Sequence, residues 1–161
     1  MREYITLVFL SLALPASAQT VPTAWKVVTD AKAVCQLAVP PDWTPFADGT
    51  GAAVFHDPTT AIAVVTSQPG QIFKPLSDSQ LKTLGVPKDK VFENTAKRLF
   101  YQDKTSSSSD DPNAFSSMVP GRDGTCSCHL VAVPSITEDV ARKIALSLGP
   151  VTQETQAEKK P

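Results

Sequence analysis

The sequence lacks an excess of charge of either sign. It has 15 Lys and Arg residues against 16 Asp and Glu residues, which gives a net charge of −1. A nucleic-acid-binding domain carries a basic patch or stripe, and a helix that lies on an anionic membrane is basic and amphipathic. Neither pattern occurs in this chain, so we expect no nucleic-acid partner and no attachment to a membrane surface.

Catalytic signatures are also scarce. The chain contains two histidines, His56 and His129, and it has no G-x-S-x-G nucleophile motif, Walker-type phosphate loop or dinucleotide fingerprint. His56 precedes Asp57 at an expected turn. Adjacent residues of a strand point in opposite directions, so this pair is badly placed to act as an oriented general base. We therefore expect no catalytic residues and no enzymatic activity.

Long apolar stretches are absent after the first eighteen residues, and none approaches the roughly 20 residues that span a bilayer. The first eighteen residues themselves begin with Met1-Arg2-Glu3, continue with an apolar run from Tyr4 to Leu14 and end in Ala16-Ser17-Ala18. This order is typical of a secretory signal peptide. We expect cleavage after Ala18 and a secreted or periplasmic protein with no transmembrane segment after cleavage.

The remaining chain has the length of one domain. We divide it into a short leader (19–24), a single α/β domain (25–151) and a polar disordered tail (152–161). Residues 104–113 form a Ser-rich stretch without an apolar side chain, so we expect a mobile loop inside a hairpin. We expect the protein to be a monomer.

Runs of apolar residues, several of them alternating with polar ones, predict strands. The expected strands are 25–30, 34–39, 52–56, 60–66, 90–102, 115–119 and 126–133. Residues 60–66 are apolar on both faces, which is typical of a central strand that is covered on both sides. The pattern in 90–102 slips near Lys97-Arg98 and predicts a bulge or a break there.

Two segments carry helix signals. Ser77-Asp78-Ser79-Gln80 is a capping box that predicts a short helix ending at Gly85, with Leu81 and Leu84 facing inward. Ser135 and Glu138 have the spacing of a helix N-terminal cap and predict the start of a second helix, which Gly149-Pro150 should end. Its apolar stripe contains Val140, Ala141, Ile144, Ala145 and Leu148.

The order of these elements predicts an α+β fold. Antiparallel hairpins with two amphipathic helices are most simply arranged as a single antiparallel sheet with helices packed on its faces. We expect about five to seven strands in that sheet and two main helices.

The chain resembles PsbP/Mog1-like domains. The strand 34–39 followed by Pro40-Pro41-Asp42-Trp43 looks like the strand and P-x-W opening of that family, and Ile144-Ala145-Leu146-Ser147-Leu148 looks like its closing I-x-x-S-(L/F) helix. The resemblance extends from Trp25 to Leu148. It implies a small α/β/α sandwich with an accessory or binding role, and it transfers no catalytic motif.

Three cysteines are the remaining candidates for chemistry. Cys126 and Cys128 share one face of their expected strand, and Cys35 lies on a core face of another. Thiols that meet across a core in an oxidising compartment should form a disulfide. We favour Cys35–Cys126, because both residues lie near strand starts, while Cys128 lies deeper among apolar neighbours and suits a buried thiol. Pairing of Cys35 with Cys128 remains open at this point.

The alternative use of these residues is a metal or redox site. Cys126-Ser127-Cys128-His129, with Cys35, could bind Cu or Zn, because soft thiolates select these ions. Two features count against it: the C-x-x-C spacing is missing, and His129 falls on the opposite strand face. We therefore expect no cofactor and no metal ligands.

The sequence best supports an exported non-catalytic accessory or binding domain. Its partner would be a protein or a small apolar ligand. The second hypothesis is a thiol-based metal-binding or redox protein that uses the Cys126-Ser127-Cys128 strand.

Overall fold

The structure is a computed structural model that describes residues 25–46, 53–56, 61–103, 114–131 and 136–152. The expected signal peptide and leader (1–24), the Ser-rich segment (104–113) and the tail beyond residue 152 lie outside the described residues. Within the described part of the chain, no helix is long and apolar enough to cross a membrane.

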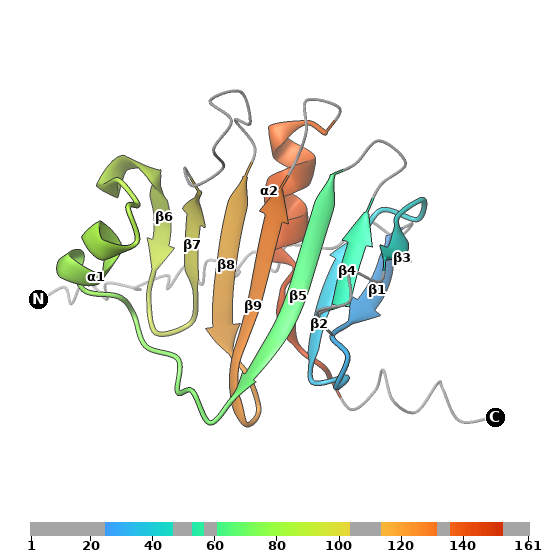
Figure 1. The fold of residues 1–161 in the computed structure, drawn as a ribbon, viewed down its shortest axis with the longest axis horizontal. Helices are drawn as coiled ribbons and strands as arrows, with labels where there is room; N and C mark the ends of the chain where they lie inside the picture. The colour runs from blue at the N-terminus through green and yellow to red at the C-terminus, as the bar shows by residue number, and fades with distance from the viewer. Residues whose placement is uncertain (1–24, 47–52, 57–60, 104–113, 132–135, 153–161) are drawn as a thin grey trace, which may run out of the picture.

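Seven antiparallel strands form the main sheet (Figure 1), in the order β3-β4-β5-β9-β8-β7-β6. The expected hairpins formed by strands 52–56 and 60–66, by 90–102 and 115–119, and by 115–119 and 126–133 are confirmed as the antiparallel pairs β4–β5, β7–β8 and β8–β9. The strand that is apolar on both faces, β5, lies inside the sheet and pairs with β9 from Ile62 opposite Val131 to Pro69 opposite Gly124. Ala63 and Val65 are buried on one face, but Ile62 on the other face is 36% exposed, so the expected cover on both sides is incomplete. The strands are β3 (Thr44–Phe46), β4 (Ala53–His56), β5 (Ile62–Pro69), β6 (Val91–Asn94), β7 (Leu99–Gln102), β8 (Phe115–Pro120) and β9 (Gly124–Val131).

A second, smaller sheet contains β1 (Lys26–Thr29), β2 (Cys35–Val39) and β10 (Gly149–Pro150), in the order β1-β2-β10. The prediction of a single sheet is therefore wrong. Alternation shows that one face of β2 is buried, but it cannot tell a strand that pairs in a sheet from one that packs across its face. In the structure, β2 lies against the large sheet and contacts β5 and β9.

The expected strand 90–102 is two strands. A 3₁₀ turn, η1 (Lys88–Lys90), leads into β6, and a tight turn then reverses the chain into β7. The backbone N–H of Thr95 donates to the carbonyl oxygen of Arg98 at 2.9 Å. The slip in the apolar pattern at Lys97-Arg98 thus marks a hairpin turn, which is the break that the pattern allowed.

The first helix, α1 (Asp78–Thr83), has the predicted capping box at Ser77. The Ser77 N–H donates to Gln80 Oε1 at 2.8 Å, and Gly85 ends the helix with φ of +70°, a left-handed conformation that glycine adopts without strain. Leu81 is buried as predicted, but Leu84 is 44% exposed. The inward prediction for Leu84 is therefore wrong, although its backbone is helical and its N–H donates to the Gln80 carbonyl oxygen at 3.0 Å. Helical spacing gives the direction of a side chain but not whether another element covers it.

The second helix, α2 (Glu138–Leu146), buries Ala141, Ile144 and Ala145 of the predicted stripe, while Val140 is partly buried. The helix ends before Gly149-Pro150, the predicted stop, which instead forms the strand β10. Its N-cap is Thr137, whose side chain accepts from Val140 N–H, and not Ser135, which lies outside the described residues. The serine of the closing motif, Ser147, accepts a hydrogen bond from the Ala38 N–H at 2.8 Å. That hydroxyl therefore fastens the end of α2 to β2.

Two apolar clusters lie on opposite faces of the large sheet, because consecutive residues of β7 belong to different clusters. Phe100 joins a large cluster that also contains residues of α2, β2, β5, β8 and β9. Leu99 and Tyr101 join a small cluster with Leu81 of α1 and Val86. Figure 1 shows α2 passing behind the large sheet and α1 beside β6.

Candidate functional site

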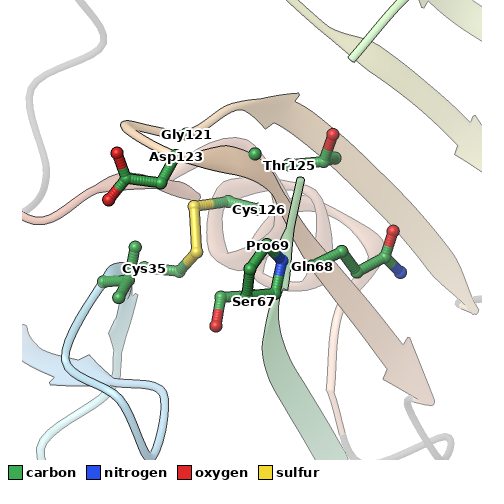
Figure 2. A pocket seen from close by; sticks show the side chains of 10 residues that line it. Cys35, Ser67, Gln68, Pro69, Gly121, Asp123, Thr125 and Cys126 are labelled. Carbon is green, nitrogen blue, oxygen red and sulfur yellow. A yellow bond between two sulfur atoms is a disulfide. The ribbon is translucent and has the colours of Figure 1, made fainter. Parts of the chain in front are cut away.

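A disulfide joins the two sheets at the end of the molecule where β9 begins (Figure 2). Cys35 of β2 and Cys126 of β9 are bonded with an S–S distance of 2.06 Å and a Cα–Cα distance of 5.6 Å. Both residues have no exposed surface. The structure thus joins the pair that the sequence favoured, and it does so across 91 residues of chain.

A small cleft of about 90 Å³ runs alongside the disulfide. It lies between β5 and the turn that connects β8 to β9, and its lining includes Ser67, Gln68, Gly121 and Asp123 (Figure 2). A Cβ at Gly121 would lie 3.3 Å from Cys126 Sγ, so this glycine lets the turn approach the disulfide. The cleft is well below the roughly 300–1,000 Å³ typical of small-molecule pockets.

Gly124 permits the closest backbone approach in this region. A Cβ at Gly124 would overlap the carbonyl oxygen of Gln68. The turn is also held by two backbone hydrogen bonds, from Gly121 N–H to Gly124 O at 2.7 Å and from Gly70 N–H to Asp123 O at 2.8 Å. The hairpin tip beside the disulfide is therefore rigidly attached to β5.

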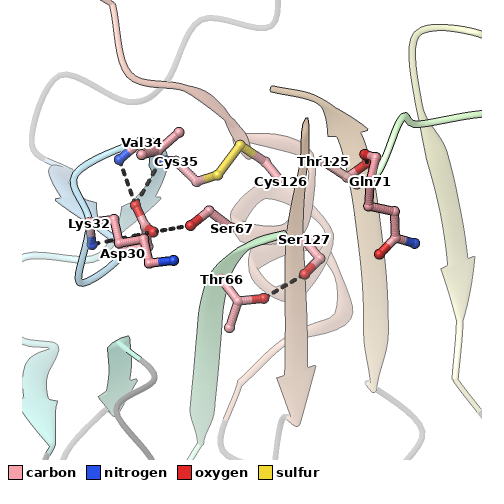
Figure 3. Close-up of a disulfide and its surroundings, with 10 residues drawn as sticks. All are labelled: Asp30, Lys32, Val34, Cys35, Thr66, Ser67, Gln71, Thr125, Cys126 and Ser127. Atoms are coloured by element: carbon pink, nitrogen blue, oxygen red, sulfur yellow. Dashed lines mark hydrogen bonds between the residues drawn. A yellow bond between two sulfur atoms is a disulfide. The ribbon is translucent and has the colours of Figure 1, made fainter. Parts of the chain in front are cut away.

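Asp30 organises the turn that leads into Cys35 (Figure 3). Its Oδ1 accepts from the N–H groups of Val34 at 2.7 Å and Cys35 at 2.8 Å, and its Oδ2 accepts from the Ser67 hydroxyl at 2.7 Å. Burial by itself raises the pKa of Asp30, but these hydrogen bonds outweigh burial and hold the pKa below its usual value. Since Ser67 belongs to β5, the carboxylate is a second, polar link between the sheets.

Cys128 is a buried free thiol, as the sequence predicted. Burial raises the pKa of its thiol to about 12, because a thiolate is poorly stabilised away from water. The structure brings the three cysteines to one core, but two of them are bonded to each other and the third is protonated at neutral pH. Among the described residues, no group of three or more His, Cys, Asp or Glu side chains could hold a metal ion.

His129 does not meet the cysteines. His129 points to the opposite face of β9, where its Nδ1 lies 3.0 Å from Ser116 Oγ and 3.5 Å from Asp103 Oδ2. Both partners contact the same ring nitrogen and Ser116 is buried, so this is not the arrangement of a catalytic triad, in which Ser and Asp contact different nitrogens. His56 ends β4, and its side chain and Asp57 lie outside the described residues.

The cluster of His129, Ser116 and Asp103 was missed by sequence reasoning. Tyr101 completes it: burial raises the pKa of Tyr101, partly offset by a hydrogen bond with Ser116, and Asp103 adds a smaller upward effect. Tyr101 belongs to β7, Ser116 to β8 and His129 to β9, and Asp103 follows the last residue of β7. Only the register, which sets Ser116 opposite both Tyr101 and His129, could have revealed their contact.

The fold has a counterpart among solved structures. A solution structure of cyanobacterial PsbP (CyanoP) from Synechocystis sp. PCC 6803 aligns with a TM-score of 0.51 and 12% identity, over 85% of this chain and 98% of that chain. A crystal structure from Bacteroides thetaiotaomicron VPI-5482 aligns with a TM-score of 0.49 and 14% identity, over 82% of this chain and 50% of that chain.

The chain therefore has a PsbP-like fold, which confirms the resemblance predicted from the sequence at the level of the fold. At 12% identity the alignment carries the fold alone. No protein-family model matches the sequence, and no curated protein matches it either.

Proposed function

We propose that this protein is an exported, non-catalytic accessory domain that binds another protein. The observation that carries the proposal is the buried Cys35–Cys126 disulfide within a PsbP-like fold. Structural disulfides persist in oxidising compartments, and residues 1–18 have the pattern of a secretory signal peptide. The resemblance to PsbP/Mog1-like domains implies an accessory or binding role rather than catalysis.

A protein partner is favoured over a small apolar ligand. The cleft beside the disulfide holds only about 90 Å³, which is too small to enclose an ordinary ligand. The hollow of about 550 Å³ between α1 and η1 is large enough, but Asp78, Lys82 and Lys88 in its lining do not suit an apolar ligand. The two sheets are fixed to each other there by the disulfide and by the bond from Ser67 to Asp30. A rigid body of this kind presents preformed surfaces, and preformed surfaces suit recognition of a protein.

The second hypothesis, a thiol-based metal or redox protein, has less support. Metal binding needs thiolates, yet Cys35 and Cys126 are disulfide-bonded and burial holds the pKa of Cys128 at about 12. A catalytic disulfide needs access for an attacking thiolate, whereas neither bonded cysteine is exposed.

Purification of the protein from its own host, with the native leader, tests the proposal. We expect an N-terminus at Gln19, one free thiol that reacts only after unfolding, and a defined heteromeric adduct after chemical cross-linking of the exported fraction. An intact Met1 on exported material would refute the signal-peptide assignment. Stoichiometric Cu or Zn, or two or three reactive thiols in the folded protein, would replace the proposal with the thiol-based alternative.

A further inference from the structure

The three cysteines lie in the large cluster, although only two of them can be bonded at one time. Cys126 and Cys128 are two residues apart on β9, so their side chains point to the same face of the sheet. Cys35 of β2 is bonded to Cys126 (Figure 3). All three side chains belong to the cluster, and none is more than 2% exposed. The core therefore holds three sulfur atoms and one disulfide, and the partner of Cys126 is a choice between Cys35 and Cys128.

The folded strand β9 disfavours a bond between Cys126 and Cys128. Both residues are paired in register with β5 on one side and with β8 on the other, so the backbone between them is held extended. In an extended strand the Cα atoms of residues i and i+2 are about 6.8 Å apart, at the upper limit of the distance that a disulfide spans. The Cα atoms of Cys35 and Cys126 are 5.6 Å apart. Folding therefore selects Cys35 as the partner of Cys126.

In the unfolded chain the preference is reversed. Cys35 and Cys126 are 91 residues apart along the sequence, whereas Cys126 and Cys128 are separated by a single serine. The probability that two residues of a flexible chain meet falls with roughly the 3/2 power of the length of chain between them, which favours the short ring by on the order of a hundredfold. Packing of the core and chain entropy thus select different partners for the same cysteine.

Burial of Cys128 controls the exchange between the two pairings. A disulfide is attacked by a thiolate and not by a thiol. In the folded protein, burial raises the pKa of the Cys128 thiol to about 12, so on the order of one molecule in 10⁵ carries the thiolate at neutral pH. In the unfolded chain a cysteine has a pKa of about 8.5, and roughly a quarter of the molecules carry the thiolate at pH 8. Cys128 can therefore attack the disulfide once the core has opened, and not before.

We propose that the single disulfide changes partners with folding, so that Cys126 is bonded to Cys128 in the unfolded oxidised chain and to Cys35 in the folded protein. On folding, the Cys35 thiolate attacks Cys126 Sγ, the bond from Cys126 to Cys128 breaks, and Cys128 leaves as a thiolate. The proton that Cys35 loses is balanced by the proton that Cys128 takes up, so the exchange needs no oxidant and no reductant. Cys128 is thus the transient partner that keeps Cys126 oxidised until β2 packs against β9.

Purified mature protein with its disulfide intact tests the exchange without added thiol or oxidant. The protein is unfolded in concentrated guanidinium at pH 8, alkylated with iodoacetamide after timed intervals and digested with trypsin. The digest places Cys35 in peptide 33–82 and the other two cysteines in peptide 123–142. We expect the alkylated residue to change from Cys128 to Cys35 in more than about 90% of the molecules, because the short ring is favoured in the unfolded chain. Dilution of the denaturant before alkylation should return the free thiol to Cys128.

Matched controls identify Cys128 as the attacking group. Unfolding at pH 4 should leave the free thiol at Cys128, because almost no thiolate is present there. The folded protein kept at pH 8 for the same time should also keep its free thiol at Cys128. In Cys128→Ala, unfolded at pH 8, the bond between Cys35 and Cys126 should persist. The rate in the parent should be unchanged over roughly a tenfold range of protein concentration, as expected for attack within one chain.

A free thiol that stays at Cys128 after unfolding at pH 8 would overturn the exchange, and so would a Cys35–Cys128 bond as the main product. Migration of the thiol in the folded protein at the rate of the unfolded chain would refute the control by burial. Loss of the Cys35–Cys126 bond in unfolded Cys128→Ala would refute Cys128 as the attacking group. The experiment uses the isolated chain, so each of these results leaves the proposed accessory function standing.

Discussion

The two faces of the large sheet have different physical roles. One face is covered by α2 and the small sheet, and it holds the disulfide together with the large cluster. The other face carries the small cluster, in which α1 contributes one buried residue, Leu81. Buried apolar side chains are therefore concentrated on the first face, whereas the second face holds a cluster of four buried residues among those described.

The difference follows from how each helix is attached. Three residues of α2 are buried, and the Arg98 guanidinium donates to the carbonyl oxygens of Leu146 at 2.8 Å and Leu148 at 3.4 Å. A cation at a helix C-terminus also interacts favourably with the helix dipole. Six-residue α1 is too short to be stable by itself and depends on its cap and a single buried leucine.

Removal of the disulfide should have the largest effect on the first face. Cys35→Ala combined with Cys126→Ala releases a cross-link across 91 residues, which corresponds to about 4.5 kcal/mol on the chain-entropy model. Urea unfolding of the variant and of the oxidised parent measures the difference in the free energy of unfolding. A loss below about 1 kcal/mol would mean that the unfolded chain keeps the two strands together without the bond.

Matched leucine truncations compare the two faces directly. Leu130→Ala removes a fully buried side chain from the large cluster and should cost about 4 kcal/mol, whereas Leu81→Ala on α1 should cost about 2 kcal/mol, because the short helix can relax into the cavity. The denaturant midpoints of the two variants, at an unchanged m-value, give the loss in the free energy of unfolding for each. Equal losses would show that the two faces contribute equally to the stability of the domain.

Asp30→Asn weakens the polar link between the sheets and should cost about 2 kcal/mol at neutral pH, since hydrogen bonds to a charged group are lost. The folded pKa of Asp30 lies below its ordinary value of 3.8. Its contribution is therefore present above that value and disappears as the pH falls through the folded pKa. The stability curves of parent and variant should approach each other as the pH falls below 3.8. Asp42→Asn, at an exposed carboxylate, is the control, and a gap between parent and Asp30→Asn that does not narrow below pH 3.8 would contradict the assignment.

Removal of the helix caps should have the smallest effect and should distinguish local from global stability. Ser77→Ala on α1 and Thr137→Ala on α2 should each cost about 1 kcal/mol. We expect Ser77→Ala to speed amide exchange only in α1, while Thr137→Ala lowers the global unfolding free energy, because α2 is part of the large cluster. Hydrogen exchange read by mass spectrometry measures the exchange rates in both variants. If Ser77→Ala lowered the global free energy of unfolding, α1 would unfold together with the core.

Local features of the chain were predictable. The capping box at Ser77, the hairpins β4–β5 and β8–β9, and the burial of Cys128 all follow from residues close in sequence. Cys126 was favoured over Cys128 as the partner of Cys35 because Cys35 and Cys126 lie near strand starts, and the structure has the Cys35–Cys126 bond. The exposure of Leu84 was not predictable from periodicity, because helical spacing does not show whether another element covers the last turn of α1.

Long-range placement was not predictable. Alternation in β2 shows which side chains are buried, but whether the strand pairs at the edge of the large sheet or packs across its face depends on contacts with β5 and β9, which lie far away in sequence. The same holds for the contact of His129 with Ser116 and for the hollow beside α1.

The sequence by itself determined most of the elements, the buried faces of β2, β9 and α2, and the core position of the three cysteines, because these depend on side-chain periodicity and local hydrogen bonding. Only the tertiary structure decided that there are two sheets, that Asp30 and the disulfide join them, and that Lys82 and Lys88 lie at one hollow beside α1. The physical reason is that packing between elements is set by the shape and register of surfaces formed by distant parts of the chain.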